Sequence, residues 1–381
     1  MNTSKKILII LKKITCLILV FILISSVCAC KEQIYDTIGA PSTDKFSKGE
    51  PASSPWDLCY FNGKIYLGSG DYNVNTGPTD IWAYNLQTLL WEKTGTLQEE
   101  AVTRFVVLDE KLVALGADST QDWSFGSFYL LNNQKWIQYR NIPNAVHVFD
   151  MIEFDNKLFA GIGTEYNALP ILVSQDKGLT FNPVPMIKDD KPYDLSVYAF
   201  SRAYEFFTFN EQLNVLTRHY LQDDYQGERK YVCEIFRYEN GKMYYHSNAD
   251  FFTTSTNVGV NLLNAKGVFE DTAYFASNYL YSSQDLKNFT RIDLPEKEFV
   301  SDFFILDDVM YVLGYKPISD KTFSVVIYST KNIRQGFYEI KSFEYPVPPL
   351  SFVLVNENFY LGMGNKTNTN KHNGTVLKVK L

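Results

Sequence analysis

The chain has 381 residues, a formal net charge of −7 and an aromatic content of 15%. An acidic chain argues against nucleic acid as its partner, because binding to phosphates requires clustered Lys and Arg. The 26 Tyr and 28 Phe favour β-strands, since aromatic side chains fit a pleated, half-buried surface.

The first thirty residues have the pattern of an export signal. Lysines at positions 5, 6, 12 and 13 precede an almost unbroken apolar run from Ile14 to Val27. A helix of that length covers about 21 Å, which is too short for the ~30 Å hydrocarbon core of a bilayer. A basic segment followed by a short apolar run predicts a signal peptide, and the alternative is an uncleaved membrane anchor.

The end of this run, Val27-Cys28-Ala29-Cys30, resembles the bacterial lipobox, in which a small residue precedes the cysteine that receives a diacylglycerol. Cys28 departs from that pattern, because a small or apolar residue is usual there. The resemblance implies a signal peptide over residues 1–29 and lipidation of Cys30. It also implies a chain that an N-terminal acyl anchor holds at the lipid bilayer of the cell envelope, facing outside the cytoplasm. Residues 30–54 are polar and are predicted to be a lipid-anchored tether.

One short pattern recurs seven times after the tether. Its first copy is Phe61-Asn62-Gly63-Lys64-Ile65, in which an apolar residue is followed by turn-forming polar residues and then by a new apolar run. The pattern returns about every 50 residues, a period that suits one four-stranded propeller blade. Its copies begin at Phe61, Leu108, Phe154, Phe209, Phe269, Leu306 and Val355.

Each copy has the chemistry of a β-hairpin, because Asn, Asp and Gly tolerate the turn conformations that join two strands tightly. A second pair of strand-like runs follows, as at Ile81–Tyr84 and Leu90–Lys93 in the first repeat. The sequence therefore predicts an all-β fold, a single seven-bladed β-propeller of four-stranded antiparallel blades over residues 55–381.

The seventh repeat lacks residues for a complete blade. Gly374–Leu381 can supply its third strand, and nothing follows for the fourth. A strand borrowed from the N-terminal side, from Ile34–Ile38 or from the segment near Phe46, would close the blade. The alternative is an open, three-stranded last blade.

The third repeat contains Ser174-Gln175-Asp176-Lys177-Gly178-Leu179-Thr180-Phe181, which resembles the Asp-box of sialidase-like propellers. The resemblance implies a structural turn between the third and fourth strands of a blade, rather than an activity. In this turn Asp176 accepts backbone N–H bonds, Gly178 takes a left-handed conformation and Phe181 packs between blades. A degenerate copy runs from Ser283 to Phe289.

The resemblance to sialidases does not extend to their site motifs. Such an enzyme would need three arginines that grip the carboxylate of the substrate, and Arg104, Arg202 and Arg218 are candidates that no motif supports. The Arg-Ile-Pro motif of that family is absent, because the matching place has Ser54-Pro55-Trp56-Asp57. Tyr84 to Trp91 is similar to kelch propellers, but the kelch diglycine is missing.

The loops that join the second and third strands are long and differ between repeats, so we expect them and the loops between blades to carry recognition residues. Exposed aromatic side chains beside carboxylates and amides are typical of a platform for a glycan or a protein ligand; the alternative is that these aromatic side chains pack between blades. The candidate ligand-binding residues are Trp56, Asp57, Asp71, Tyr72, Arg104, Asp122, Trp123, His147, Glu165, Tyr166, Arg202, Arg218 and His219.

The sequence predicts no metal site and no cofactor. Asp71-Tyr72-Asn73-Val74-Asn75 provides oxygen ligands of the kind that calcium prefers, but Gly77 comes one position late for an EF-hand loop. The leading hypothesis is a monomeric, non-catalytic cell-surface propeller that binds a glycan or a protein. The alternatives are a glycan-active hydrolase or lyase of sialidase-like architecture and a scaffold in an envelope complex.

Overall fold

The computed structural model describes residues 34–46, 49–71, 73–164, 168–221, 231–252, 265–365 and 368–381. The chain divides into two compact units, residues 1–36 and 37–381, and the account below concerns the second. The described residues form strands and short 3-10 helices without an α-helix, and no helix among them is long and apolar enough to cross a membrane. The predicted signal peptide and Cys30 lie outside the described residues.

Four of the sheets have four strands each. One of them contains β2 (Asp57–Phe61), β3 (Lys64–Gly68), β4 (Thr79–Asn85) and β5 (Leu90–Leu97). Two others contain β20 (Ala265–Phe269), β21 (Thr272–Ser277), β22 (Tyr279–Ser283) and β23 (Thr290–Ile292), and β24 (Phe299–Leu306), β25 (Val309–Ser319), β26 (Thr322–Thr330) and β27 (Tyr338–Tyr345). The last has the order β1-β30-β29-β28, with β1 (Tyr35–Gly39), β28 (Pro349–Val355), β29 (Asn358–Met363) and β30 (Thr375–Lys380).

A fifth sheet has fourteen strands. Its first group contains β6 (Glu99–Leu108), β7 (Lys111–Ser119), β8 (Phe125–Asn132) and β9 (Lys135–Pro143), and its second contains β10 (His147–Phe154), β11 (Lys157–Gly163), β12 (Ile171–Ser174) and β13 (Asn182–Pro183). Its third group contains β16 (Tyr198–Phe209), β17 (Gln212–Leu221), β18 (Tyr231–Glu239), β19 (Lys242–Asn248), β14 (Met186–Lys188) and β15 (Lys191–Pro192). Strand β14 adds to β19 in parallel. The 3-10 helices are η1 (Pro41–Asp44), η2 (Pro51–Ser53), η3 (Asp250–Phe252) and η4 (Ile333–Gln335).

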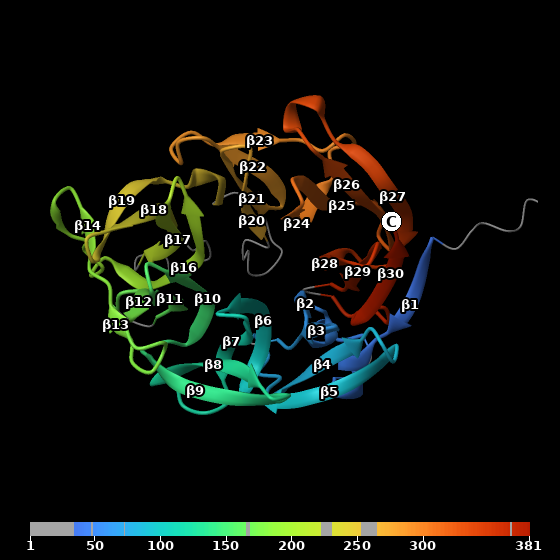
Figure 1. The fold of residues 1–381 in the computed structure, drawn as a ribbon, viewed down its shortest axis with the longest axis horizontal. Helices are drawn as coiled ribbons and strands as arrows, with labels where there is room; N and C mark the ends of the chain where they lie inside the picture. The colour runs from blue at the N-terminus through green and yellow to red at the C-terminus, as the bar shows by residue number, and fades with distance from the viewer. Residues whose placement is uncertain are drawn as a thin grey trace, which may run out of the picture. The chain divides into compact units, whose positions relative to one another are not determined.

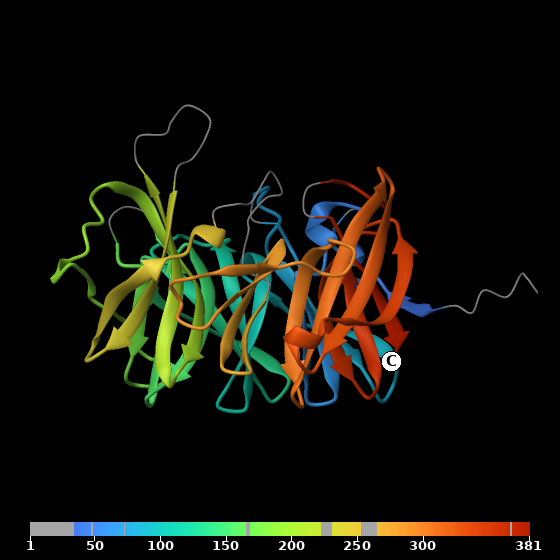
Figure 2. The same cartoon turned by 90° about the horizontal axis from the view of Figure 1, so that it is seen from above.

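The sheets of the second unit stand around a central opening (Figure 1). The innermost strands are β2, β6, β10, β16, β20, β24 and β28, and the view from the side shows the strands running between the two faces of the ring (Figure 2). Apolar side chains fill the space between neighbouring sheets. In one such layer Ile81 of β4 and Tyr66 of β3 pack with Phe105 of β6 and Leu112 of β7. This radial all-β arrangement is a β-propeller.

The seven predicted hairpin turns have one shared backbone geometry. Both central residues of each turn have positive φ, between 45° and 60° for the non-glycine residues. This conformation belongs to the type I′ turn, whose twist matches that of the flanking strands. The prediction of a hairpin at each repeat is therefore confirmed. The paired residues are Asn62-Gly63, Asp109-Glu110, Asp155-Asn156, Asn210-Glu211, Glu270-Asp271, Asp307-Asp308 and Asn356-Glu357.

An N-terminal strand lies beside the C-terminal one. The sheet order places β1 next to β30, and residues 37–39 of β1 belong to the second unit. The indole Nε1 of Trp91 donates to the carbonyl oxygen of Ile38 at 2.8 Å, and the Ile38 side chain packs against the cluster that contains Leu58 and Ile65. Of the alternatives for the last repeat, the structure has the borrowed strand, of which residues 37–39 belong to the same unit as β30.

Most of the predicted tether belongs to the folded unit. Residues 37–54 fall within unit 37–381, and Phe46, Ala52 and Ser53 are buried. The amide of Gly70 donates to the carbonyl oxygen of Ala52 at 2.8 Å, which ties η2 to the end of β3. The segment is polar on average, so its composition indicated a tether. The burial of a few residues such as Phe46 and Ala52, which composition does not reveal, attaches it to the fold.

Candidate functional site

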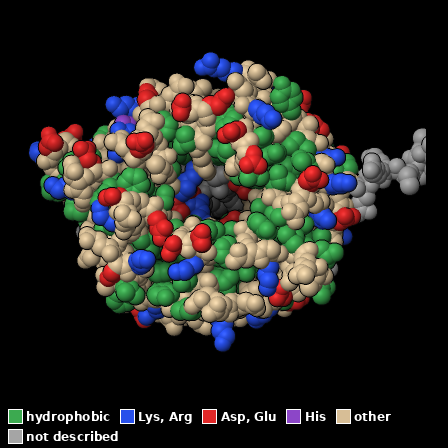
Figure 3. All heavy atoms as spheres, viewed as in Figure 1, with side chains coloured by type: hydrophobic (Ala, Val, Ile, Leu, Met, Phe, Trp, Pro, Cys, Tyr) green, Lys and Arg blue, Asp and Glu red, His purple; other side chains and the backbone are tan. Residues whose placement is uncertain are grey.

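A cavity of about 520 Å³ lies on the axis of the ring. Each of the seven innermost strands contributes at least one residue to the lining. Figure 3 shows that this face is hollowed at its centre, with basic and acidic side chains at the opening. The lining residues are Trp56, Asp57, Thr103, Arg104, Phe105, Val106, Asp150, Glu205, Lys266, Gly267, Asp302, Phe303, Phe304, Ile305, Leu350 and Ser351.

The polar residues of this lining occupy one equivalent position in the repeats. They stand four residues before the apolar residue that opens each hairpin turn, except that the fifth repeat has Ala265 there and Lys266 next to it. In five inner strands the pairing register shifts just before this position, and such a bulge re-aims a side chain. The equivalent residues are Asp57, Arg104, Asp150, Glu205, Ala265, Asp302 and Ser351.

Three aspartates at this position link their own inner strand to the inner strand of the next repeat. Asp57 Oδ2 accepts the backbone N–H of Phe105 at 2.7 Å, and Asp150 Oδ2 accepts that of Phe206 at 2.7 Å. Asp302 Oδ2 accepts the N–H of Phe352 at 3.2 Å. Each bond joins two neighbouring inner strands, and hydrogen bonds to a charged group are among the stronger ones in proteins. We call these three contacts the latches.

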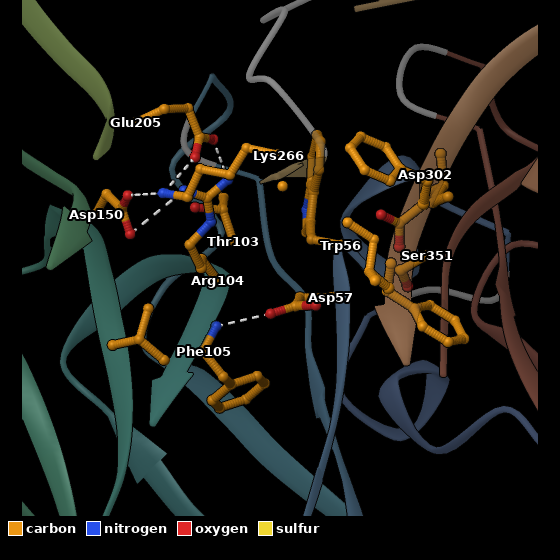
Figure 4. Close-up of a pocket in the computed structure, with 16 residues that line it drawn as sticks. Trp56, Asp57, Thr103, Arg104, Phe105, Asp150, Glu205, Lys266, Asp302 and Ser351 are labelled. Carbon is orange, nitrogen blue, oxygen red and sulfur yellow. Dashed lines mark hydrogen bonds and ion pairs between the residues drawn. The ribbon is translucent and has the colours of Figure 1, made fainter. Parts of the chain in front are cut away.

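Four charged side chains form a network across one half of the cavity (Figure 4). Arg104 forms ion pairs with Glu205 and with Asp150, the latter at 3.6 Å. Lys266 contacts Asp150 and lies 2.8 Å from Glu205. Burial opposes the charge on Arg104, but the carboxylates of Glu205 and Asp150 outweigh it and raise the pKa of the guanidinium. Two cations and two carboxylates therefore balance one another on β6, β10, β16 and β20.

The other half of the cavity is lined by Trp56, Asp57, Asp302, Ser351 and their apolar neighbours. Within the part of the chain that the structure describes, neither aspartate forms an ion pair with Lys or Arg. Burial raises the pKa of Asp57. Burial, and then the charge of Asp57, raise the pKa of Asp302 well above its ordinary value. The Trp56 indole Nε1 donates to the carbonyl oxygen of Gly70 at 2.6 Å, which fixes the ring beside the cavity.

Of the predicted ligand-binding residues that the structure describes, Trp56, Asp57 and Arg104 line this cavity. Arg218 is buried, donates to the carbonyl oxygen of Phe252 at 2.7 Å and lies 4.1 Å from the ring centre of the same residue. The Arg202 guanidinium lies 5.1 Å from the ring of Phe200. The three arginines that a sialidase would need therefore have different surroundings.

The two predicted histidines lie inside the sheets. His219 is fully buried, with Nδ1 2.8 Å from Ser201 Oγ and Nε2 2.9 Å from Thr217 Oγ1. Burial lowers the pKa of His219 to about 3, so the ring is neutral at pH 7. His147 Nδ1 lies 2.8 Å from Asp118 Oδ1. Both rings have internal partners that fix them within the fold.

The remaining predicted residues lie on loops. Asp122 forms an ion pair with Arg140 at 2.6 Å, and Trp123 is 48% exposed. Asp71 Oδ1 accepts the backbone N–H of Asn73 at 2.9 Å. Among the described residues no group of three or more His, Cys, Asp or Glu could hold a metal ion. The expectation of no metal and no cofactor, with calcium near Asp71 as the alternative, stays a prediction. Tyr72, Glu165 and Tyr166 lie outside the described residues.

The turn between β12 and β13 has the bonds that the Asp-box resemblance implies. Asp176 Oδ1 accepts the N–H of Thr180 at 2.8 Å, and Ser174 Oγ accepts that of Gly178, also at 2.8 Å. Gly178 has φ of +86°, and Phe181 packs edge-on against Phe128 of the neighbouring group. The geometry describes a stable turn, and membership of an Asp-box family stays a prediction.

Sequence reasoning missed Asp150, Glu205, Lys266 and Asp302. The signal that could have found them is the position four residues before each turn, which carries a charge in five of the seven repeats. No local motif marks these residues, because each repeat contributes one side chain and the fold alone brings them together.

A scan against family models and a sequence search among curated proteins both give no match. In fold, the chain is similar to a chain of the mitotic checkpoint complex, at 8% identity and a TM-score of 0.50, covering 87% of this chain and 93% of that one. It is also similar to a puromycin hydrolase mutant, at 7% identity and a TM-score of 0.50, covering 86% of this chain and 51% of that one. The β-propeller domain of the Trilobed protease from Pyrococcus furiosus matches at 12% identity and a TM-score of 0.43, covering 85% and 94%. At these identities the likeness concerns the fold alone, which is a β-propeller.

Proposed function

We propose that the chain is a non-catalytic binding propeller of the cell envelope whose central cavity takes a glycan. The propeller has seven four-stranded blades in this proposal, and β14 and β15 extend one of them beyond β19. The fourteen-stranded sheet divides into three blades where single residue pairs, His147 with Ala117 and Gly163 with Arg202, join its groups. The lipobox resemblance at Cys30 supports the part of this proposal that puts the protein on the lipid bilayer, facing outside the cytoplasm.

The observation that carries the proposal is the Trp56 ring beside Asp57, Asp302 and Ser351 in a cavity of about 520 Å³. An aromatic face next to a few fixed polar groups suits a sugar, because the ring covers the C–H face while the polar groups orient the hydroxyls. The cavity volume lies within the range of about 300–1,000 Å³ that is usual for small-ligand sites.

Titration of the purified chain with a panel of glycans tests this proposal, with tryptophan fluorescence as the signal. We expect at least one glycan to bind, and Trp56→Ala to abolish that binding. Trp123→Ala is the matched control, because Trp123 is exposed on a loop and does not line the cavity. Absence of binding at millimolar glycan, or binding that Trp56→Ala leaves unchanged, would contradict the proposal. Capture of an envelope protein instead would favour the protein-ligand alternative.

A second candidate function is hydrolysis of a glycoside. It is supported by two carboxyl groups with raised pKa, Asp57 and Asp302, in the same cavity, since glycosidases use one protonated and one ionised carboxyl group. A panel of fluorogenic glycosides separates the candidates. Turnover that disappears in both Asp57→Asn and Asp302→Asn would favour the hydrolase, and binding without turnover would favour the non-catalytic protein.

A further inference from the structure

The charges in the cavity are divided unevenly between its two halves. On β6, β10, β16 and β20, the cations Arg104 and Lys266 meet the carboxylates of Asp150 and Glu205. On the side of β2 and β24, Asp57 and Asp302 form no ion pair with Lys or Arg in the described part of the chain, and the charge of Arg104 offsets only part of the rise that burial causes in their pKa. Among the lining residues that the structure describes, carboxyl groups therefore outnumber cations by two, and the two that form no ion pair lie on one side.

The same side carries the aromatic wall of the cavity. Trp56 directly precedes β2 and is held by its bond to Gly70, and Figure 4 shows its ring near Asp302 and Ser351. A carboxylate inside a cavity is costly until a cation meets it, and the face of an indole attracts a cation as well. An aromatic ring in the same half of the cavity as two carboxyl groups is thus matched to a positively charged organic group.

We infer that this half of the cavity binds a protonated amine, with the ammonium group near Asp57 and Asp302 and the carbon skeleton over Trp56. An ammonium has three N–H donors, which suits two carboxylates and the Ser351 hydroxyl. The inference rests on the proposed function and narrows it, because the glycan would be one that carries a free amino group.

The test compares three probes on the full chain by calorimetric titration: a tetrasaccharide of glucosamine, the fully N-acetylated tetrasaccharide, and 1,5-diaminopentane. Acetylation removes the positive charge and keeps the sugar rings. We expect the glucosamine tetrasaccharide to bind at least tenfold more tightly than its acetylated form. The diamine carries ammonium groups without a sugar ring, so its binding shows whether the site takes an ammonium group from a molecule other than a sugar.

The variants Asp57→Asn and Asp302→Asn keep an acceptor oxygen for the backbone N–H of Phe105 and Phe352, so the latches stay while the charge is lost. Each should weaken the binding of the glucosamine probe at least tenfold without a large change in thermal stability. Asp109→Asn is the control, because its carboxylate is exposed outside the cavity, and it should bind like the unmodified chain.

The outcomes separate the inference from the function on which it rests. Equal affinity for both tetrasaccharides would overturn the ammonium site and leave the glycan-binding function in place. Binding of the diamine alone, weakened in Asp57→Asn and Asp302→Asn, would support the ammonium site and count against a glycan. If none of the three probes binds, or if the two variants bind as well as Asp109→Asn, the inference is wrong.

Discussion

Arg104→Met removes the guanidinium from the centre of the charge network and keeps an unbranched apolar side chain in its place. Arg104 pairs with Glu205 and Asp150, whose side chains are only 1% and 3% exposed. Removing one partner of a buried ion pair costs about 3–5 kcal/mol, because the remaining charge stays buried. Lys266 still lies 2.8 Å from Glu205, so we expect a loss of about 3 kcal/mol, at the lower end of that range.

The assay is urea unfolding followed by circular dichroism, in which the midpoint falls in proportion to the lost stability when the slope is unchanged. The control is Arg291→Met, since Arg291 pairs with Asp293 at 2.7 Å on the surface, with both side chains about half exposed. Exposed pairs contribute roughly 0–1 kcal/mol. If the urea midpoint of Arg104→Met is no lower than that of Arg291→Met, the charge network does not stabilise the fold and the reasoning is refuted.

A double-mutant cycle then measures the coupling itself. Glu205→Gln removes the partner charge, so the combined variant no longer buries an unpaired carboxylate at this place. We expect the double variant to lose less stability than the sum of the two single variants, by at least about 1 kcal/mol, as is found for residues within one network. Additive losses would mean that Arg104 and Glu205 act independently.

Three further predictions concern other parts of the ring. Burial raises the pKa of Glu99 to about 8, above the ordinary 4.5. The folded chain therefore holds this proton between those pH values, and the free energy of unfolding falls as the pH rises through them. Glu99→Gln should reduce this fall between pH 5 and pH 8 by about a few kcal/mol, as measured by unfolding at the two pH values. Asp302→Ala leaves the N–H of Phe352 without its latch partner and should cost about 1–3 kcal/mol, whereas Asp302→Asn should cost less, and equal losses would argue against the latch. Asp176→Ala should speed hydrogen exchange of the Thr180 amide, which mass spectrometry can follow, while the amide at the degenerate turn, Asn288, exchanges as before.

The turns were predictable because their chemistry is local. Asn62-Gly63 and its counterparts carry the side chains that positive φ requires, and an apolar run follows each of them. The fold class follows from repeating that local signal at intervals of about 50 residues. The parallel addition of β14 to β19 has no such signal, because its few pairs, such as Met186 with Met243, join segments far apart in the sequence.

The candidate site was predictable only in part, because its residues are brought together by contacts between segments far apart in the sequence. The sequence predicted Asp57 and Arg104 as ligand-binding residues, and the structure places them at the start of β2 and in the middle of β6, where both line the cavity. Arg218 and His219 lie near the end of β17, and their side chains are buried inside the third group of the large sheet. A bulge in the strand and the packing of the neighbouring sheet decide whether such a side chain points into the central cavity or is buried between sheets. The sequence of a single repeat reveals neither of them.

The latches give the cavity a property that neither the fold nor the charges would have alone. The carboxylate of Asp57 both holds the inner strand of the next sheet, through Phe105, and faces the cavity. Asp302 does the same through Phe352. A ligand that contacts these carboxylates meets groups that the backbone of a neighbouring strand already orients, so little ordering remains to be done on binding. Because Asn keeps the latch and Ala removes it, the difference between these two substitutions at one position separates the contribution of orientation from that of charge.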